Sequence, residues 1–168
     1  MLNAGAWRGL GITAGRRGNF ADAARFLQVA AQANPTDAST VSDYGYALMR
    51  AGEVEQARVP LMQAQQMAGS SAKIAGNLVI WLTVNDRKQE AASLAAHTQL
   101  STAARKAIDD DAMQVMRAWR DRRIARETAP AAPVAPRAVA TLQPAARPSN
   151  HPLALQRGRL LDTLEVAQ

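Results

Sequence analysis

Residues that commonly begin helices recur at a spacing of 34 along the first part of this chain. Asn3, Asp37 and Ser71 are typical N-cap residues, and each precedes a segment with a similar arrangement of apolar and small side chains. When the first two segments are aligned, six positions coincide: Leu10 with Tyr44, Gly11 with Gly45, Gly18 with Gly52, Ala23 with Ala57, Leu27 with Leu61 and Ala30 with Ala64. An internal repeat of this length restricts the chain to stacked copies of one small supersecondary unit.

The repeated segments are expected to form pairs of helices. Aromatic residues make up only 4% of the chain, and Ala, which loses no side-chain entropy in a helix, is much commoner than Val or Ile. The predicted helices are 4–16 and 20–33 in the first repeat and 38–50 and 54–68 in the second, with a third pair beginning at 72. Pro60 lies beyond the first turn of 54–68 and predicts a kink or a late start of that helix. The fold is therefore predicted to be all-α.

We predict one helical domain followed by a less regular C-terminal region. The domain spans about 1–127 and contains repeats at about 4–37, 38–71 and 72–100, then a capping helix at about 101–127. The third repeat is degenerate, since Asp86 stands in place of the turn glycine. Residues 128–152 are rich in Pro and Ala, a composition typical of a disordered linker. Residues 153–168 regain Leu and Val at partly helical spacing and are compatible with a short tail helix.

Helical spacing also predicts which side chains are buried. Five apolar residues of the repeats should lie between helices: Trp7, Leu10, Leu27, Leu61 and Leu78. In the capping helix, six residues are spaced to cover the open face of the third repeat: Ala107, Ile108, Met113, Val115, Met116 and Trp119.

The period of 34 and the helix-turn-helix pattern are similar to those of tetratricopeptide repeats. This resemblance implies a solenoid of three repeats that acts as a non-enzymatic scaffold for protein-protein interaction. It also implies that the first helix of each repeat lines a concave groove. The groove residues that the family pattern assigns in this chain are Arg8, Ile12, Arg16, Tyr46, Met49, Arg50, Lys73 and Ile80.

Such a groove would be basic with an apolar floor. Arg side chains can bind a carboxylate through two hydrogen bonds, and Tyr46 and Met49 would supply contact area. We therefore expect a protein partner that carries an acidic or carboxylate-bearing segment. The alternative is that the exposed Arg side chains only keep the solenoid soluble.

Two stretches of the chain resemble a narrower group of repeat proteins. The first comprises residues 42–48 (SDYGYAL) with 56–61 (QARVPL), and the second comprises 76–78 (GNL) with 100–101 (LS) and the short helix that follows. Together they resemble the TadD family, the tetratricopeptide lipoproteins of the tight-adherence (Flp) pilus machinery. The resemblance implies a periplasmic, outer-membrane-associated assembly factor whose partner is a secretin or another pilus component.

The family resemblance and the sequence itself predict different cellular compartments. Members of the TadD family are expected to carry an export signal and a lipid-acceptor Cys, and neither is found in this sequence. By its sequence the chain would therefore be cytoplasmic. Association with a membrane would require a partner or an N-terminal anchor outside this sequence.

Two other functions stay open at this point. A cytoplasmic chaperone of the class II type III secretion kind is also small, has three repeats and would hold an extended export substrate in the groove. A nucleic-acid-binding accessory protein would use the net charge of +6 and a cluster of Arg residues near the end of the capping helix. These residues are Arg117, Arg120, Arg122, Arg123 and Arg126.

No residue pattern predicts catalysis or a bound cofactor. The chain contains no Cys, and neither His97 nor His151 has an evident Ser or carboxylate partner. Asp109, Asp110 and Asp111 would diverge by about 100° each on a helix and could not converge on one metal ion. We therefore expect no catalytic, cofactor or metal site and no small-molecule substrate.

Overall fold

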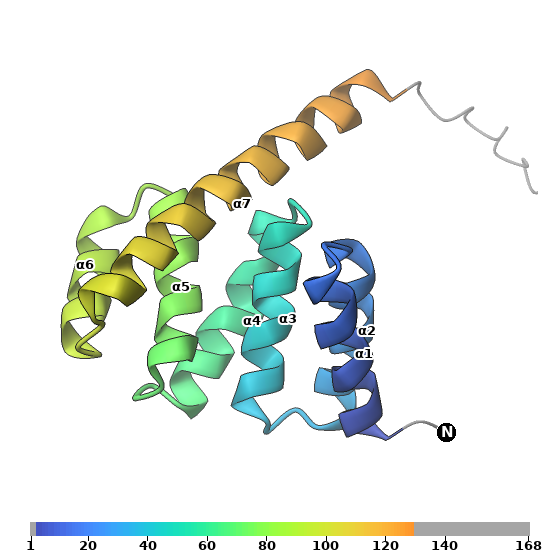
Figure 1. Ribbon diagram of the computed structural model, residues 1–168, viewed down its shortest axis with the longest axis horizontal. Coiled ribbons are helices and arrows are strands. Elements are labelled where there is room, and N and C mark those ends of the chain that lie inside the picture. The colour runs from blue at the N-terminus through green and yellow to red at the C-terminus, as the bar shows by residue number, and fades with distance from the viewer. Residues whose placement is uncertain (1–2, 130–168) are drawn as a thin grey trace, which may run out of the picture. The chain divides into compact units, whose positions relative to one another are not determined.

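The computed structural model describes residues 3–129, and this part of the chain contains seven helices and no strand (Figure 1). The helices are α1 (Ala4–Arg16), α2 (Phe20–Ala33), α3 (Ala38–Arg50), α4 (Val54–Met67), α5 (Ala72–Val84), α6 (Lys88–His97) and α7 (Thr102–Thr128). The all-α prediction is confirmed. The predicted linker and tail helix lie outside the described residues, apart from the first residues of the linker.

The residues spaced by 34 begin the first helix of each repeat. The side chain of Asn3 accepts a hydrogen bond from the backbone N–H of Ala6, and Ser71 accepts one from Ile74. Asp37 accepts bonds from the backbone of both Ser39 and Thr40. These side chains satisfy N–H groups that have no partner within the helix, which is why the helices begin at these residues.

The turn within each repeat requires the left-handed backbone conformation. Gly18 and Gly52 both have φ of 80°, a conformation that glycine adopts without steric strain. In the third repeat Asp86 takes the same place with φ of 58°. The degenerate third repeat therefore keeps the turn although it lacks the glycine.

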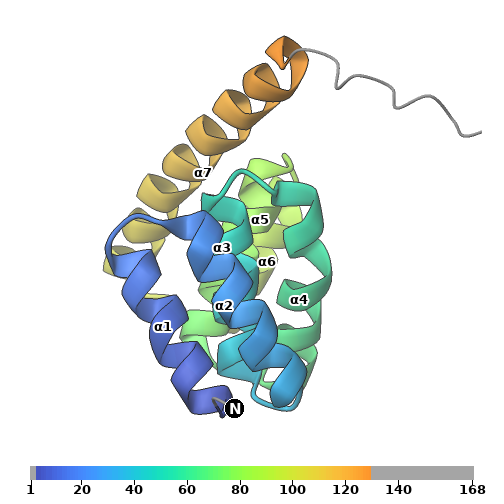
Figure 2. The same ribbon diagram turned by 90° about the vertical axis from the view of Figure 1, so that its right-hand side faces the viewer.

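The helices pack as three antiparallel pairs, in which α1 lies on α2, α3 on α4 and α5 on α6 (Figures 1 and 2). Each pair then packs on the next through α2 against α3 and α4 against α5. A Cβ atom added to Gly11 would lie 2.5 Å from Cγ of Leu27, and one added to Gly45 would lie 2.6 Å from Cγ of Leu61. The same glycine-leucine contact thus sets the close approach of the two helices in the first two repeats.

The burial predictions are right for three of the five residues. Leu27, Leu61 and Leu78 are buried, whereas Trp7 is only half-buried and Leu10 is 42% exposed. The equivalent of Leu10 in the second repeat is Tyr44, which packs against the core. Within residues 3–129 no helix precedes α1, so no described repeat covers Leu10.

The helix that contains Pro60 begins at Val54 and continues to Met67, so the predicted late start is wrong. Pro60 is buried at the seventh position of α4, where its missing N–H removes one hydrogen bond of the helix. Burial of this apolar ring offsets part of that loss.

The C-terminal helix α7 packs on α5 and α3, the first helices of the third and second repeats. Of the six residues predicted to cover the third repeat, Ile108 and Val115 are buried and Trp119 packs against the core, whereas the other three, Ala107, Met113 and Met116, are exposed. The buried residues recur every three or four positions and form one face of the helix. Within residues 3–129, no helix is both long enough and apolar enough to cross a membrane.

Polar contacts attach the second half of α7 to the turn between α3 and α4. Glu53 is mostly buried, and its carboxylate forms ion pairs with Arg122 and Arg126. Nη2 of Arg126 donates a hydrogen bond to Oε2 of Glu53 at 2.7 Å. Nε1 of Trp119 donates to the carboxylate of Glu55 at 3.0 Å. These contacts explain why α7 reaches past the third repeat to the second.

Replacing Asp37 by alanine should lower the free energy of unfolding by about 1 kcal/mol near neutral pH, because a helix loses its cap. The hydrogen bond from the hydroxyl of Thr40, at 2.6 Å, lowers the pKa of Asp37 from its ordinary value of 3.8. Because the pKa of Asp37 is lower in the folded state, its ionised side chain stabilises the fold at pH values above the unfolded-state pKa. This stabilisation is lost as the pH falls through the folded-state pKa. The free energies of unfolding of variant and parent, measured with urea, should therefore differ less below about pH 4 than near pH 7. A difference that grew on acidification would contradict this assignment.

Candidate partner-binding groove

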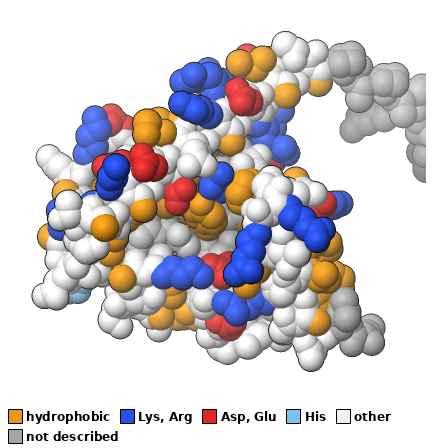
Figure 3. All heavy atoms as spheres, viewed as in Figure 1, with side chains coloured by type: hydrophobic (Ala, Val, Ile, Leu, Met, Phe, Trp, Pro, Cys, Tyr) orange, Lys and Arg blue, Asp and Glu red, His pale blue; other side chains and the backbone are white. Residues whose placement is uncertain are grey.

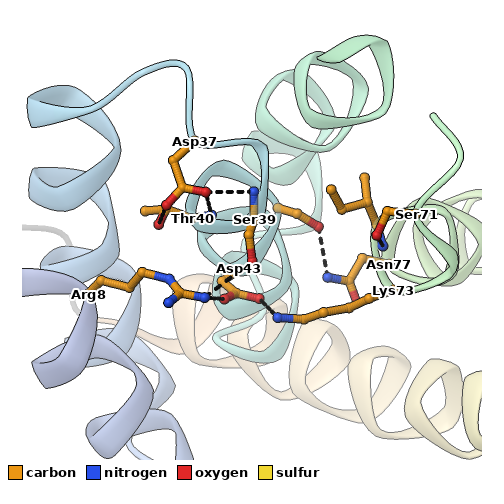
Figure 4. Close-up of polar contacts among 10 residues, drawn as sticks. Arg8, Asp37, Ser39, Thr40, Asp43, Ser71, Lys73 and Asn77 are labelled. Carbon is orange, nitrogen blue, oxygen red and sulfur yellow. Dashed lines mark hydrogen bonds and ion pairs between the residues drawn. The ribbon is translucent and has the colours of Figure 1, made fainter. Parts of the chain in front are cut away.

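A polar ladder joins the first helices of the three repeats on one face of the domain (Figure 4). Asp43 of α3 lies 3.5 Å from a guanidinium nitrogen of Arg8 in α1 and 2.6 Å from Nζ of Lys73 in α5. Nδ2 of Asn77 donates to the hydroxyl of Ser42 at 2.9 Å, which adds a second link between α5 and α3. Arg8 and Lys73 therefore already share an internal carboxylate.

An open cavity of about 560 Å³ lies beside the ladder. Its walls come from α1, α2 and α3, and α5 and α7 each reach its edge. Apolar side chains form most of its floor: Ile12, Phe20, Ala23, Leu27 and Ala47. Figure 3 shows this face hollowed, with basic and acidic side chains around the hollow. We refer to this space as the groove cavity.

Arg50 is held in the groove cavity by three different contacts. Its Nη1 donates to the hydroxyl of Tyr46 at 2.7 Å, and its Cζ lies 4.2 Å from the centre of the Phe20 ring. The carboxylate of Asp111, from α7, lies 3.6 Å from the same Nη1. Stacking on an aromatic face and a hydrogen bond at one edge fix the plane of the guanidinium. Burial raises the pKa of Tyr46, so its hydroxyl stays protonated at neutral pH.

Arg16 differs from the other basic residues of the groove cavity. It lies in the last turn of α1, its side chain is exposed, and it lines the cavity. Within residues 3–129 it forms no ion pair. It is therefore the cation of this face that is most available to a partner.

The structure brings together most of the groove residues that the sequence predicts. Ile12, Arg16, Tyr46, Arg50 and Lys73 all line the groove cavity. Arg8 lies in the polar ladder at its edge.

Two predicted groove residues are buried instead. Met49 is 0% exposed and Ile80 is 2% exposed, so neither offers a surface to a partner. Both residues belong to the hydrophobic core, which also includes Ile108, Ala112 and Val115 of α7. The apolar contact area predicted for Met49 comes instead from the cavity floor around Phe20.

Of the groove cavity residues that were not among the predicted set, three are charged or aromatic: Phe20, Asp43 and Asp111. Phe20 begins α2 and lies outside the first-helix positions that the family pattern assigns to the groove. Asp111 lies more than 60 residues beyond Arg50, and no local pattern connects the two. Asp43 lies three residues before the predicted groove residue Tyr46 and could have been found as a carboxylate among predicted cations.

The basic end of α7 is partly neutralised. Arg122 and Arg126 pair with Glu53, and Arg123 lies 3.7 Å from Glu127. Among the described residues, no three His, Cys, Asp or Glu side chains lie close enough together to hold a metal ion.

Comparison with protein families gives a match over the repeats. Residues 16–76, from the end of α1 into α5, match the tetratricopeptide repeat family model. A search of curated proteins gave no match. Repeats of this family generally mediate protein-protein interaction, and their fold is typically a non-enzymatic scaffold. The match over residues 16–76 and the three stacked helix pairs together show that residues 3–129 have an all-helical fold of the tetratricopeptide repeat type.

Proposed function

We propose that this protein is a non-enzymatic scaffold in the assembly of a tight-adherence (Flp-type) pilus or secretion apparatus, and that its groove cavity binds a carboxylate-bearing segment of a partner protein. The observation that carries the proposal is the cavity itself, which combines an apolar floor with two Arg side chains at its edge. An apolar pocket with a few fixed polar groups is the usual form of a recognition site.

Two basic residues have separate roles in the proposed binding. Arg50 is already oriented by Phe20 and Tyr46, so little side-chain entropy is lost when it binds a carboxylate. Arg16 is exposed and would attract an acidic segment from solution. Arg8 and Lys73 hold Asp43 and would contribute mainly to the positive field near the cavity.

The assignment to pilus assembly rests on the resemblance of residues 42–48, 56–61, 76–78 and 100–101, with the helix that follows, to the TadD family. A secretin or another pilus component is the partner that this resemblance implies. A cytoplasmic secretion chaperone with an extended export substrate is the second candidate, favoured by the three-repeat size of the domain. The nucleic-acid alternative has less support, because Arg122 and Arg126 pair with Glu53.

Replacing Arg16 by glutamate should weaken binding of a pilus-component peptide at least about tenfold, since hydrogen bonds to charged groups contribute about 1.5 to 3 kcal/mol. The peptide would be chosen from an array that spans the secretin and the other pilus proteins, and its affinity measured by fluorescence anisotropy. The effect should decrease as salt is added, because the side chain is exposed.

Arg17→Glu is the matched control. Arg17 is also exposed and follows directly in the chain, but it does not line the groove cavity. An equal loss of affinity in both variants would show that the groove cavity is not the binding site. Capture of export substrates in place of pilus components would favour the chaperone function.

A further inference from the structure

The groove cavity contains two carboxylates of its own. Asp43 is mostly buried and is neutralised by both Arg8 and Lys73. Asp111 is different, because its side chain is 32% exposed and, within residues 3–129, its ion pair is with Arg50, beside the hydroxyl of Tyr46. A partner that enters the cavity would therefore meet the carboxylate of Asp111.

The contact between Asp111 and Arg50 is loose. The two atoms lie 3.6 Å apart, which is longer than a hydrogen bond between a guanidinium and a carboxylate. A guanidinium carries five N–H donors, and within residues 3–129 that of Arg50 makes one hydrogen bond, to Tyr46. Arg50 is thus held in place with most of its donor capacity unused.

We infer that Asp111 is a specificity-determining residue of the groove cavity, because its carboxylate stands where the carboxylate of a partner would bind to Arg50. The inference rests on the proposed function. A partner must displace Asp111 from Arg50 and overcome its negative charge. An acidic segment without apolar side chains would then bind poorly, since only contact with the cavity floor offsets this repulsion.

The position of Asp111 on α7 allows this displacement without moving the helix. α7 is anchored by Ile108, Ala112 and Val115, which are buried, and by the contacts of its second half with Glu53. The side chain of Asp111 can therefore change rotamer while the backbone of α7 stays in place.

The test uses the full chain and two fluorescein-labelled octapeptides, one of alternating leucine and glutamate and one of alternating leucine and glutamine. Asp111→Asn should bind the glutamate peptide about fivefold more tightly than the parent, which corresponds to about 1 kcal/mol. Its affinity for the glutamine peptide should be nearly unchanged. Asp111→Glu should bind like the parent, since it restores the carboxylate.

Asp110→Asn is the matched control for charge. Asp110 is exposed and adjacent in α7 but does not line the groove cavity, so its replacement should leave the affinity for the glutamate peptide close to that of the parent. Thermal unfolding of each variant would verify that α7 remains folded.

The outcomes separate this inference from the proposed function. If Arg50→Gln abolishes binding of the glutamate peptide and Asp111→Asn does not improve it, the groove binds carboxylates but Asp111 does not compete. Equal gains in Asp110→Asn and Asp111→Asn would show a general charge effect and overturn the inference. Failure of Asp111→Asn to bind the glutamate peptide would overturn both the inference and the proposed function.

Discussion

Replacement of Leu61 by alanine should lower the free energy of unfolding by about 2 to 5 kcal/mol, from lost burial and the cavity left behind. Leu61 is fully buried in α4 and lies against Gly45 of α3, where the two helices pack closely. Chemical unfolding followed by circular dichroism would measure the loss. A change below about 1 kcal/mol would mean that this contact does not hold the helix pair together.

The contact can be verified with a second substitution in the same place. Gly45→Ala alone should destabilise, because the new methyl group would lie 2.6 Å from Cγ of Leu61 and the strain of about 1 to 3 kcal/mol exceeds the gain in helix propensity. In the Leu61→Ala background the same substitution should stabilise, since the methyl group enters the space that the leucine leaves. Additive effects of the two substitutions would contradict the proposed packing.

Gly52→Ala should destabilise the domain more than Gly18→Ala, although both glycines have φ of 80° in equivalent turns. The backbone strain of a left-handed alanine is common to the two variants and amounts to about 1 to 2 kcal/mol. At Gly52 the added Cβ would also lie 2.6 Å from the carbonyl oxygen of Ala118 in α7, whereas at Gly18 no atom lies within 4 Å. The additional loss should be at least about 1 kcal/mol.

Hydrogen exchange would show where the additional loss arises. In Gly52→Ala the amides of α7 near Val115 and Trp119 should exchange faster, because the backbone of α7 must move away from the turn. In Gly18→Ala the exchange of α7 should match that of the parent. Equal losses of stability, with α7 unchanged in both variants, would show that the turn does not support α7.

The sequence predicted the repeats well because their signals are local. The caps at Asn3, Asp37 and Ser71 and the turns at Gly18 and Gly52 each depend on a few neighbouring residues. These signals recur at a fixed period, which makes each one more reliable than it would be alone. Five of the eight groove residues also line one cavity for this reason, since the repeat assigns each side chain to a face of its helix.

The remaining features depend on contacts between distant parts of the chain. The spacing of Ile108 and Val115 predicts that α7 covers the third repeat, but not that it also packs on α3 of the second repeat. The position of Asp111 beside Arg50 follows from that docking. Asp43 could have been identified as a carboxylate near the groove cations, but its pairing with both Arg8 and Lys73 depends on the stacking of three helices.

The docking of α7 also determines which repeats should unfold together. In a repeat protein each unit normally interacts only with its neighbours, so stability is a sum of local terms. Because α7 contacts both α3 and α5, the second and third repeats share a common partner and should unfold together. The first repeat is joined to them mainly through α2 against α3 and should fray first. Residues of α1 and α2 line the groove cavity, so a partner bound there would stabilise the first repeat. Binding of the partner would then be detected as reduced fraying of α1.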